Sequence, residues 1–214
     1  MENKNQDILT LLQSSFLFCG LNSLQLQNLA QKTRIHTYKP GRLLIEEDII
    51  NDNVFIIIKG LVKIYKITPE GKEIFLAVEK SRDYLGVMDL SVAPATATVE
   101  TLESTSVLTF HKKDLLLLLK ENSLLWEKMY HILTVKLQQY TNLHQIVQGN
   151  TLYDKTYLIL DFISRLSKNN IISLSHETIA HIVGATRPRV TEILHALEDA
   201  KKIHIAPKKI TLLA

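Results

Sequence analysis

Apolar residues recur along this chain with two different periods, helical at both ends and strand-like in between. The first 31 residues show the helical spacing, which places several leucines on one face. That predicted face comprises Leu21, Leu24, Leu26 and Leu29. Ser23 can accept a hydrogen bond from an otherwise unpaired amide in the first turn, so we expect it to cap a helix.

From about Arg34 to Phe110 the pattern changes to short runs rich in β-branched and aromatic residues. These runs are RIHTY, RLLIEE, NVFIIIKG, LVKIYKI, EIFLAV, ATATVETL and SVLTFH. Pro69 and Gly71 fit a hairpin turn between LVKIYKI and EIFLAV. Several short strands at this spacing predict an antiparallel β-barrel or sandwich.

After Lys112 the spacing is helical again, and residues 124–148 can form one helix of about 25 residues. This helix has two apolar faces. One follows coiled-coil spacing and comprises Trp126, Tyr130, Leu133, Leu137, Tyr140, His144 and Val147. The other comprises Leu125, Met129, Ile132, Leu143 and Ile146. Two apolar faces need two partners, so we expect the β-rich region on one side; a second copy of the protein, or burial within one subunit, covers the other.

The segment SHETIAHIVGATRPRVTEILHAL predicts two short helices joined by a turn. Ser175 and Thr186 are placed to cap them, Gly184 permits the reversal, and Pro188 suits a first helical turn. The apolar faces are Ile179, Ile182 and Val183 on the first helix, and Val190, Ile193, Leu194 and Leu197 on the second. This is the layout of a helix-turn-helix, in which the second helix enters the DNA major groove.

Two short strands around Ala206-Pro207-Lys208-Lys209 would add a β-hairpin wing, which predicts a winged helix. Arginine can bind guanine O6 and N7 with two parallel hydrogen bonds, and lysines contact phosphates. We therefore predict DNA contacts from Thr186, Arg187, Arg189, Thr191, Lys208 and Lys209. The alternative is an ordinary helical hairpin with solvated arginines.

The composition, 46% hydrophobic and 22% charged, is that of a soluble globular protein. A net charge of +3 permits nucleic acid as a partner but does not demand it, so any basic surface must be local. No apolar run approaches the roughly 20 residues that span a bilayer, and no secretory signal is recognisable at the start. We expect a cytoplasmic protein without a membrane partner.

The single cysteine, Cys19, excludes an internal disulfide and an iron–sulfur cluster held by four cysteines of this chain. Haem remains possible, because one axial histidine or cysteine can hold its iron. The candidates outside the DNA-binding region are His36, His111, His131, His144 and Cys19. No metal-ligand spacing, nucleophile–base arrangement or phosphate-binding glycine loop is present, so we expect neither a metal site nor an enzyme.

The order of a β-rich domain, a long helix and a winged helix-turn-helix resembles the Crp/Fnr family of transcription regulators. The likeness rests on DYLG followed by ATATVETLESTSVLTF, on Asp154, on TIAHIVGATR and on LHALEDAKKI. The resemblance implies a cytoplasmic homodimer that binds a two-fold symmetric DNA site, works with RNA polymerase and leans toward activation. In the recognition helix Pro188 and Glu192 stand where well-known members have a glutamate and an arginine, which implies a different half-site.

A second departure concerns the effector. In cyclic-AMP-binding members a glutamate follows the cassette glycine, and an arginine further along pairs with the cyclic phosphate. Here Val87 and Ala95 occupy those positions, and Thr96 offers one hydroxyl. A buried phosphate without a cationic partner is poorly stabilised, so cyclic AMP is disfavoured. The resemblance implies an effector pocket around Gly86, Val87, Ala95, Thr96 and Tyr130, with an unidentified ligand.

Together these patterns predict an α+β protein with three parts. Residues 1–121 form an antiparallel β-barrel of the cyclic-nucleotide-binding, jelly-roll kind; residues 122–149 form a dimerisation helix; residues 150–214 form the winged helix-turn-helix. The function we expect is that of a homodimeric, sequence-specific DNA-binding regulator. The alternative is a β-barrel ligand-binding module that acts through protein–protein contacts.

Overall fold

The computed structural model describes residues 2–90, 94–148, 151–166, 170–207 and 209–213. The chain divides into two compact units. The first runs to Val62 and includes Ser81–Gln138; the second contains Lys63–Lys80 and the chain from Gln139 onward. The long helix α4 (Ser123–Gln148) contributes residues to both units.

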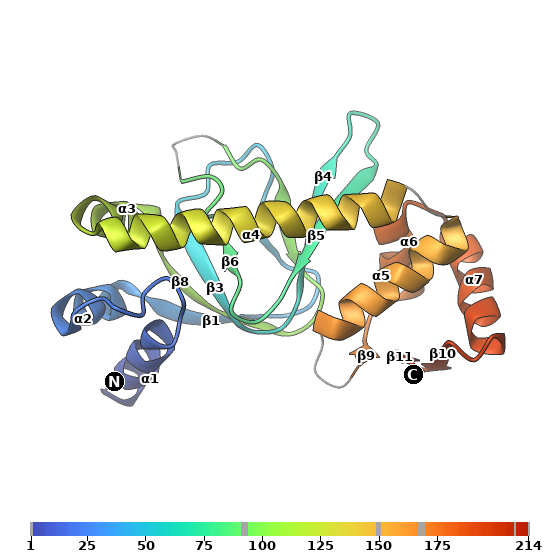
Figure 1. Cartoon of the computed structure of the whole chain (residues 1–214), viewed down its shortest axis with the longest axis horizontal. Coiled ribbons are helices and arrows are strands. Elements are labelled where there is room, and N and C mark those ends of the chain that lie inside the picture. Colours follow the sequence, from blue (N-terminus) through green and yellow to red (C-terminus); the bar gives the residue numbers. More distant parts are fainter. Residues whose placement is uncertain (1, 91–93, 149–150, 167–169, 208, 214) are drawn as a thin grey trace. The chain divides into compact units, whose positions relative to one another are not determined.

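Two helices open the first unit, α1 (Glu2–Gln13) and α2 (Ser23–Lys32), and they lie side by side (Figure 1). The expected cap of α2 is wrong by one residue: Asn22 Oδ1 accepts from the Gln25 amide (2.8 Å), and the Asn22 amide donates to Gln25 Oε1 (3.3 Å). This reciprocal capping box makes Ser23 the first helical residue. Leu24 is 66% exposed, so the predicted apolar face is wrong there.

The strands of the first unit follow the predicted runs, except for β6, which the sequence did not predict. They are β1 (Arg34–Tyr38), β2 (Leu43–Ile45), β3 (Asn53–Lys59), β6 (Tyr84–Leu85), β7 (Thr98–Thr101) and β8 (Thr105–His111), followed by α3 (Lys112–Glu121). A four-stranded antiparallel sheet has the order β1-β8-β3-β6, and β2 pairs with β7. The fold class is confirmed, but the strands form separate sheets and not a closed barrel. The two-residue strand β6 is an edge that is too short to carry the ladder further.

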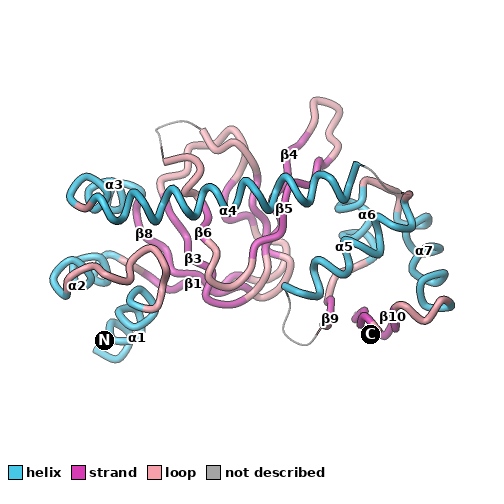
Figure 2. The backbone as a smooth tube through the Cα atoms, in the orientation of Figure 1, coloured by secondary structure: helices cyan, strands magenta, loops and turns pink. Residues whose placement is uncertain are grey.

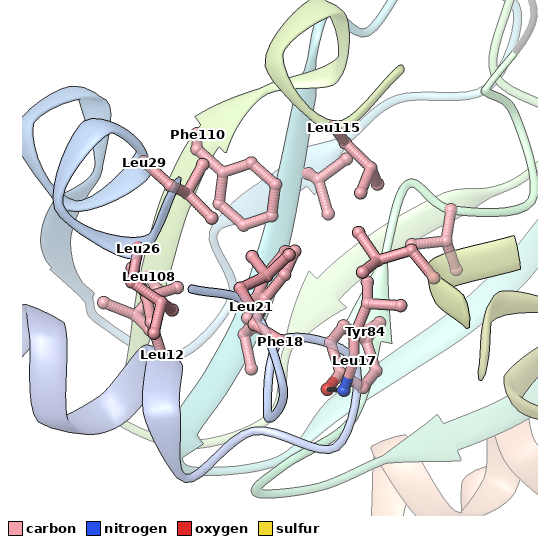
Figure 3. Close-up of a cluster of buried hydrophobic side chains, with 14 of the residues drawn as sticks. Leu12, Leu17, Phe18, Leu21, Leu26, Leu29, Tyr84, Leu108, Phe110 and Leu115 are labelled. Carbon is pink, nitrogen blue, oxygen red and sulfur yellow. Dashed lines mark hydrogen bonds between the residues drawn. The ribbon is translucent and has the colours of Figure 1, made fainter. Parts of the chain in front are cut away.

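One face of this sheet packs against the N-terminal helices (Figure 3). The Phe18 and Phe110 rings meet edge to face with centroids 5.6 Å apart. The Tyr84 hydroxyl accepts from the Leu17 amide (2.9 Å), and burial raises the pKa of Tyr84. The residues labelled in the figure are Leu12, Leu17, Phe18, Leu21, Leu26, Leu29, Tyr84, Leu108, Phe110 and Leu115. The same cluster includes three residues of α4, Leu125, Met129 and Ile132.

The two predicted faces of α4 therefore differ in burial. Leu125 and Met129 are each 1% exposed, whereas Tyr130 is 74% exposed and Leu137 is 65% exposed. Trp126 is also half exposed. The structure buries the face that we expected against the β-rich region and leaves the coiled-coil face open to solvent.

The second unit begins with a hairpin of β4 (Val62–Ile67) and β5 (Glu73–Glu79). The Thr68 amide donates to the Lys72 carbonyl (2.9 Å), and the Gly71 amide donates to the Thr68 carbonyl (2.8 Å). The turn lies where Pro69 and Gly71 predict it, with Gly71 at φ 79°. The hairpin prediction is confirmed.

After the end of α4, the second unit is completed by a winged helix (Figures 1 and 2). Its elements are α5 (Leu152–Leu166), β9 (Ile171–Ile172), α6 (His176–Val183), α7 (Arg187–Asp199), β10 (Ile203–Ala206) and β11 (Lys209–Leu212). The two predicted wing strands pair antiparallel, and β9, which the sequence did not predict, adds a third strand in the order β10-β11-β9. None of the helices in the described ranges has the length and apolarity needed to cross a membrane.

Candidate nucleic-acid interface

Helix α6 is tightly specified at both ends. Ser175 Oγ accepts from the Thr178 amide (3.0 Å), as the sequence predicts. At the other end Gly184 adopts the left-handed conformation (φ 70°, ψ 40°), and the Ala185 amide returns to the Ala180 carbonyl (2.9 Å). This end geometry reverses the chain within a few residues and begins α7 at Arg187.

Helix α7 is held by its apolar face and leaves its first turn open. Val190, Leu194 and Leu197 are 0% exposed. Thr186 occupies the cap position, but its side chain makes no capping hydrogen bond, so that part of the prediction is wrong. Pro188 lies in the first turn, where the helix has no partner for an N–H.

Two of the predicted cations, Arg187 and Arg189, lie in this open turn, and Lys209 lies at the start of β11 in the wing. Arg187, Arg189 and Lys209 are all exposed. Arg189 Nη1 lies 2.7 Å from Glu192 Oε2, and both side chains are 64% exposed, so solvent screens this pair. Within the described part of the chain, the Arg187 guanidinium has no hydrogen-bond or ion-pair partner. Lys208, another predicted contact, lies outside the described residues.

The predicted contact Thr191 is already engaged within the helix pair. Its Oγ1 lies 2.9 Å from His176 Nδ1, which links α7 to the start of α6. Burial lowers the pKa of His176, and the neighbouring His195 and Arg187 charges act in the same direction. A neutral imidazole suits this hydrogen bond, so His176 is a structural residue of the helix pair.

His181 makes a contact that the sequence did not indicate. Its Nδ1 lies 3.3 Å from Glu73 Oε2 of β5, and its Nε2 lies 3.3 Å from Glu177 Oε1 of α6. Glu73 Oε2 also accepts from Lys63 Nζ (2.8 Å). The β4–β5 hairpin and α6 thus share one polar cluster. No local pattern signals it, because about a hundred residues separate the partners.

Two of the predicted effector positions, Val87 and Ala95, are buried and apolar, whereas Thr96 is exposed. Val87 is 2% exposed and Ala95 is 1% exposed. Thr96 Oγ1 donates to Asp89 Oδ1 (3.1 Å), so its hydroxyl hydrogen is already used by a carboxylate. Lys112 Nζ donates to the Asp89 backbone carbonyl. Burial lowers the pKa of Lys112, against the opposing effect of Asp89 and Asp52.

Gly86 and Tyr130, the other predicted effector residues, lie in very different surroundings. Gly86 has φ 76°, and a Cβ there would meet the Asn53 carbonyl oxygen at 2.5 Å, so only glycine fits this position. Tyr130 lies on the exposed face of α4. Residues 91–93, within the cassette segment, are outside the described ranges.

The predicted dimer residues follow one face of α4. Tyr130, Leu137 and His144 are exposed, and Leu133 and Tyr140 are half-buried. The Tyr140 hydroxyl donates to Glu79 Oε1 of β5 (2.8 Å). The side chain of Val147 and the Gly149-Asn150 break lie outside the described residues.

Among the described side chains, no group of three or more His, Cys, Asp or Glu residues is placed to hold a metal ion. His131, one of the haem candidates, packs its ring against Phe16 with centroids 5.3 Å apart. Haem ligation by His36, His111, His131, His144 or Cys19 stays a prediction from the sequence.

Comparison with known proteins gives two family matches. Residues 35–122 match the cyclic nucleotide-binding domain, and residues 157–214 match the Crp-like helix-turn-helix domain. The chain is 23% identical over 199 residues to the transcriptional activatory protein AadR of Rhodopseudomonas palustris, covering 88% of this chain and 80% of AadR. It is 19% identical over 197 residues to the cyclic AMP receptor protein of Thermus thermophilus, covering 92% and 91% of the two chains.

Among solved structures, a Crp/Fnr family regulator from Eubacterium rectale superposes with a TM-score of 0.77 at 17% identity, covering 92% of this chain and 93% of the other. That likeness concerns the fold. The fold and the two domain matches define a DNA-binding transcription regulator. The chain belongs to the Crp/Fnr family.

Proposed function

We propose that this protein is a homodimer that binds a two-fold symmetric DNA site through α7 and regulates transcription without responding to cyclic AMP. The observation that carries the proposal is the open first turn of α7. There Arg187 and Arg189 are exposed, while the apolar face of the same helix is fully buried. A helix held in this way presents its N-terminal side chains to base edges in the major groove.

Arg187 is the best-placed base reader, because its guanidinium has no partner in the described structure. Arg189 can contact DNA either after its ion pair with Glu192 breaks or through the guanidinium N–H groups that the pair does not use. Thr186, whose hydroxyl the helix does not use, and the wing residues Lys208 and Lys209 are assigned to phosphates. We assign Thr191 a weaker role, since His176 holds its hydroxyl.

The exposed face of α4 supports the homodimer. Tyr130 and Leu137 leave large apolar surfaces in water, at the four- and three-residue spacing of a helix pair. A second copy of α4 would cover them, with the interface formed by Tyr130, Leu133, Leu137, Tyr140, His144 and Val147. A two-fold symmetric DNA site requires the two α7 helices of such a dimer to enter successive major grooves, roughly 34 Å apart.

The proposal that cyclic AMP is not the effector rests on the residues around the cassette. Val87 and Ala95 are apolar and buried, and Thr96 donates to Asp89. A cyclic phosphate there would meet the Asp89 carboxylate, and the nearby Lys112 ammonium is already bonded to the Asp89 carbonyl. The described residues of the cassette therefore offer the phosphate no free cation, and a poorly paired charge is disfavoured. The name of the Thermus thermophilus relative refers to cyclic AMP; we infer that this chain has a different input.

The partner in transcription is RNA polymerase, and activation is the favoured outcome, in keeping with the name of the Rhodopseudomonas palustris relative. We propose no catalytic activity. A regulator of this kind works where the DNA is, which agrees with the predicted cytoplasmic location. The division into residues 1–121, 122–149 and 150–214 remains our proposal for the functional parts.

The direct test is selection of binding sites from random duplex DNA with purified, ligand-free protein, with Arg187→Ala as the blank. We expect a symmetric site, recovered by the wild type and lost in the blank. The affinity of the protein for the selected site should be the same, within twofold, with and without millimolar cyclic AMP. Recovery of the same site by Arg187→Ala would contradict the role given to α7. A strong cyclic AMP effect would contradict the assignment of the cassette.

The homodimer is tested by Leu137→Lys, with Gln138→Lys as the control that adds the same charge on a neighbouring exposed position. Burying a leucine contributes about 1.5–3 kcal/mol, and a symmetric interface contains the position twice. We expect the dimer dissociation constant of Leu137→Lys to rise at least about 100-fold in analytical ultracentrifugation. An equal effect of both substitutions would place the interface elsewhere.

A further inference from the structure

A cavity of 530 Å³ lies in the first unit, between the end of α1 and the sheet, and none of the predicted effector residues lines it. This volume is within the roughly 300–1,000 Å³ of typical ligand pockets. Its apolar walls come from Leu11 and Phe16 on one side and from Ile56, Ile58 and Leu108 of the sheet on the other. Ile56 and Leu108 belong to the core cluster shared with α1, so the cavity is on the helix-covered face of the sheet.

The polar groups of this cavity favour one kind of ligand. Among the described residues that line it, Arg82 is the one with a charged side chain, and no carboxylate is present. The Arg82 backbone is fixed at φ 79°, with its amide donating to the Ile57 carbonyl (2.7 Å), while its guanidinium has no partner within the described ranges. Ser81 Oγ already donates to the Ile58 carbonyl (2.7 Å), so Arg82 is the natural donor for a ligand.

We propose that this cavity binds an amphipathic carboxylate, with the hydrocarbon against the apolar walls and the carboxylate on Arg82. A cationic ligand would find no counter-charge, and a purely polar one would leave the walls unfilled. Arginine binds carboxylates with two parallel hydrogen bonds, which fixes the orientation of the head group.

Two residues of the cavity wall also contact α4, so ligand binding can affect this helix. Lys128 of α4 donates to the Cys19 carbonyl, with its Nζ 3.4 Å from Cys19 Sγ. His131 of α4 packs on the ring of Phe16, and both Phe16 and Cys19 line the cavity. We infer that occupancy shifts α4 at Lys128 and His131; any consequence for DNA rests on the proposed function.

The experiment uses octanoate, octan-1-ol and octylamine, which share a chain and differ in the charge of the head group. Calorimetry measures their affinities for the full chain. Cys19 is the chain's one cysteine and is exposed, so its alkylation rate, followed by mass, reports occupancy of this cavity. Trp126, the one tryptophan, lies on α4 near Lys128, and its emission reports on the helix without DNA.

We expect octanoate to bind tightest and to slow the alkylation of Cys19. Arg82→Gln should weaken octanoate about five- to tenfold, leave octan-1-ol unchanged and be rescued by Arg82→Lys. Ile58→Phe should weaken both by filling the cavity. Octylamine binding as tightly as octanoate, equal octanoate affinity in Arg82→Gln, or octanoate binding without protection of Cys19 would each overturn the site. Unchanged Trp126 emission at saturation would overturn the link to α4.

Discussion

The β-rich region and the helix-turn-helix differ in the surroundings of their cationic side chains. Near the cassette, Lys112 is 7% exposed and its ammonium group donates to the backbone carbonyl of Asp89. At the start of α7, Arg187 is exposed and has no partner in the described structure. The Lys112 ammonium is therefore hydrogen-bonded within the protein. The Arg187 guanidinium remains available to a ligand.

This difference shows where an anion can bind. A buried cation that is already bonded to its own backbone offers less to a phosphate, because changing partners leaves the buried carbonyl without a donor. An exposed arginine at the start of a helix loses little solvation when it meets a phosphate or a guanine edge. The start of α7 therefore leaves Arg187 available to a polyanion, whereas Lys112 near the cassette is already bonded within the protein.

The largest expected effect is the loss of DNA affinity when the exposed arginines of α7 are removed. Replacing Arg187 and Arg189 together by alanine should lower affinity for the selected DNA site about 100-fold or more, since each arginine contributes roughly 1–3 kcal/mol. The unfolding free energy should stay within about 0.5 kcal/mol of the wild type, because both side chains are exposed. Fluorescence anisotropy and urea denaturation measure the two quantities.

Lys112→Met provides the opposite result in the same two assays. Methionine keeps much of the side-chain volume but leaves the Asp89 carbonyl without its donor. We expect the unfolding free energy to fall by about 1–3 kcal/mol and DNA affinity to stay within twofold. If Lys112→Met weakened DNA binding as much as the arginine pair, the two regions would not be separable in function.

Much of the helix-turn-helix was predictable because its signals are local. Ser175 caps α6 and Gly184 ends it, and both act through residues within four positions in the sequence. The two faces of α4 were predictable for a similar reason, since helical spacing alone places Leu125 and Tyr130 on different sides. The helical spacing of the apolar residues is sufficient to predict which of them share a face.

What could not be predicted depends on distant partners. The contact of His181 with Glu73 joins a helix to a hairpin far away in the sequence. Thr186 lies in the cap position yet makes no cap bond, a matter of side-chain rotation that residue type does not determine. The closure of a β-barrel depends on how edge strands pair, and β6 has two residues. The cavity beside Arg82 arises from packing and leaves no mark in the sequence.

A third effect, smaller than the first two, compares the two cap positions of the helix pair. Ser175 makes a cap hydrogen bond and Thr186 does not. Ser175→Ala should therefore cost about 1 kcal/mol of unfolding free energy and leave the DNA contacts of α7 in place. Thr186→Ala should cost little stability and weaken DNA binding a few-fold through the loss of one phosphate contact. Equal stability losses would mean that both residues act as caps.

The smallest effect concerns His176, a titratable group that the helix pair uses internally. Its pKa is lowered in the folded state by burial, His195 and Arg187, so folding favours the neutral ring. As the pH falls through the ordinary histidine pKa of about 6.5, the unfolded chain takes up a proton more readily, and stability is lost. Urea denaturation at pH 7.5 and pH 5 should show a smaller loss in His176→Gln than in the wild type. The remaining histidines are common to both proteins, so the difference isolates this one. An identical pH dependence would mean that His176 is solvated like an ordinary surface histidine, and that its 2.9 Å contact with Thr191 does not persist in solution.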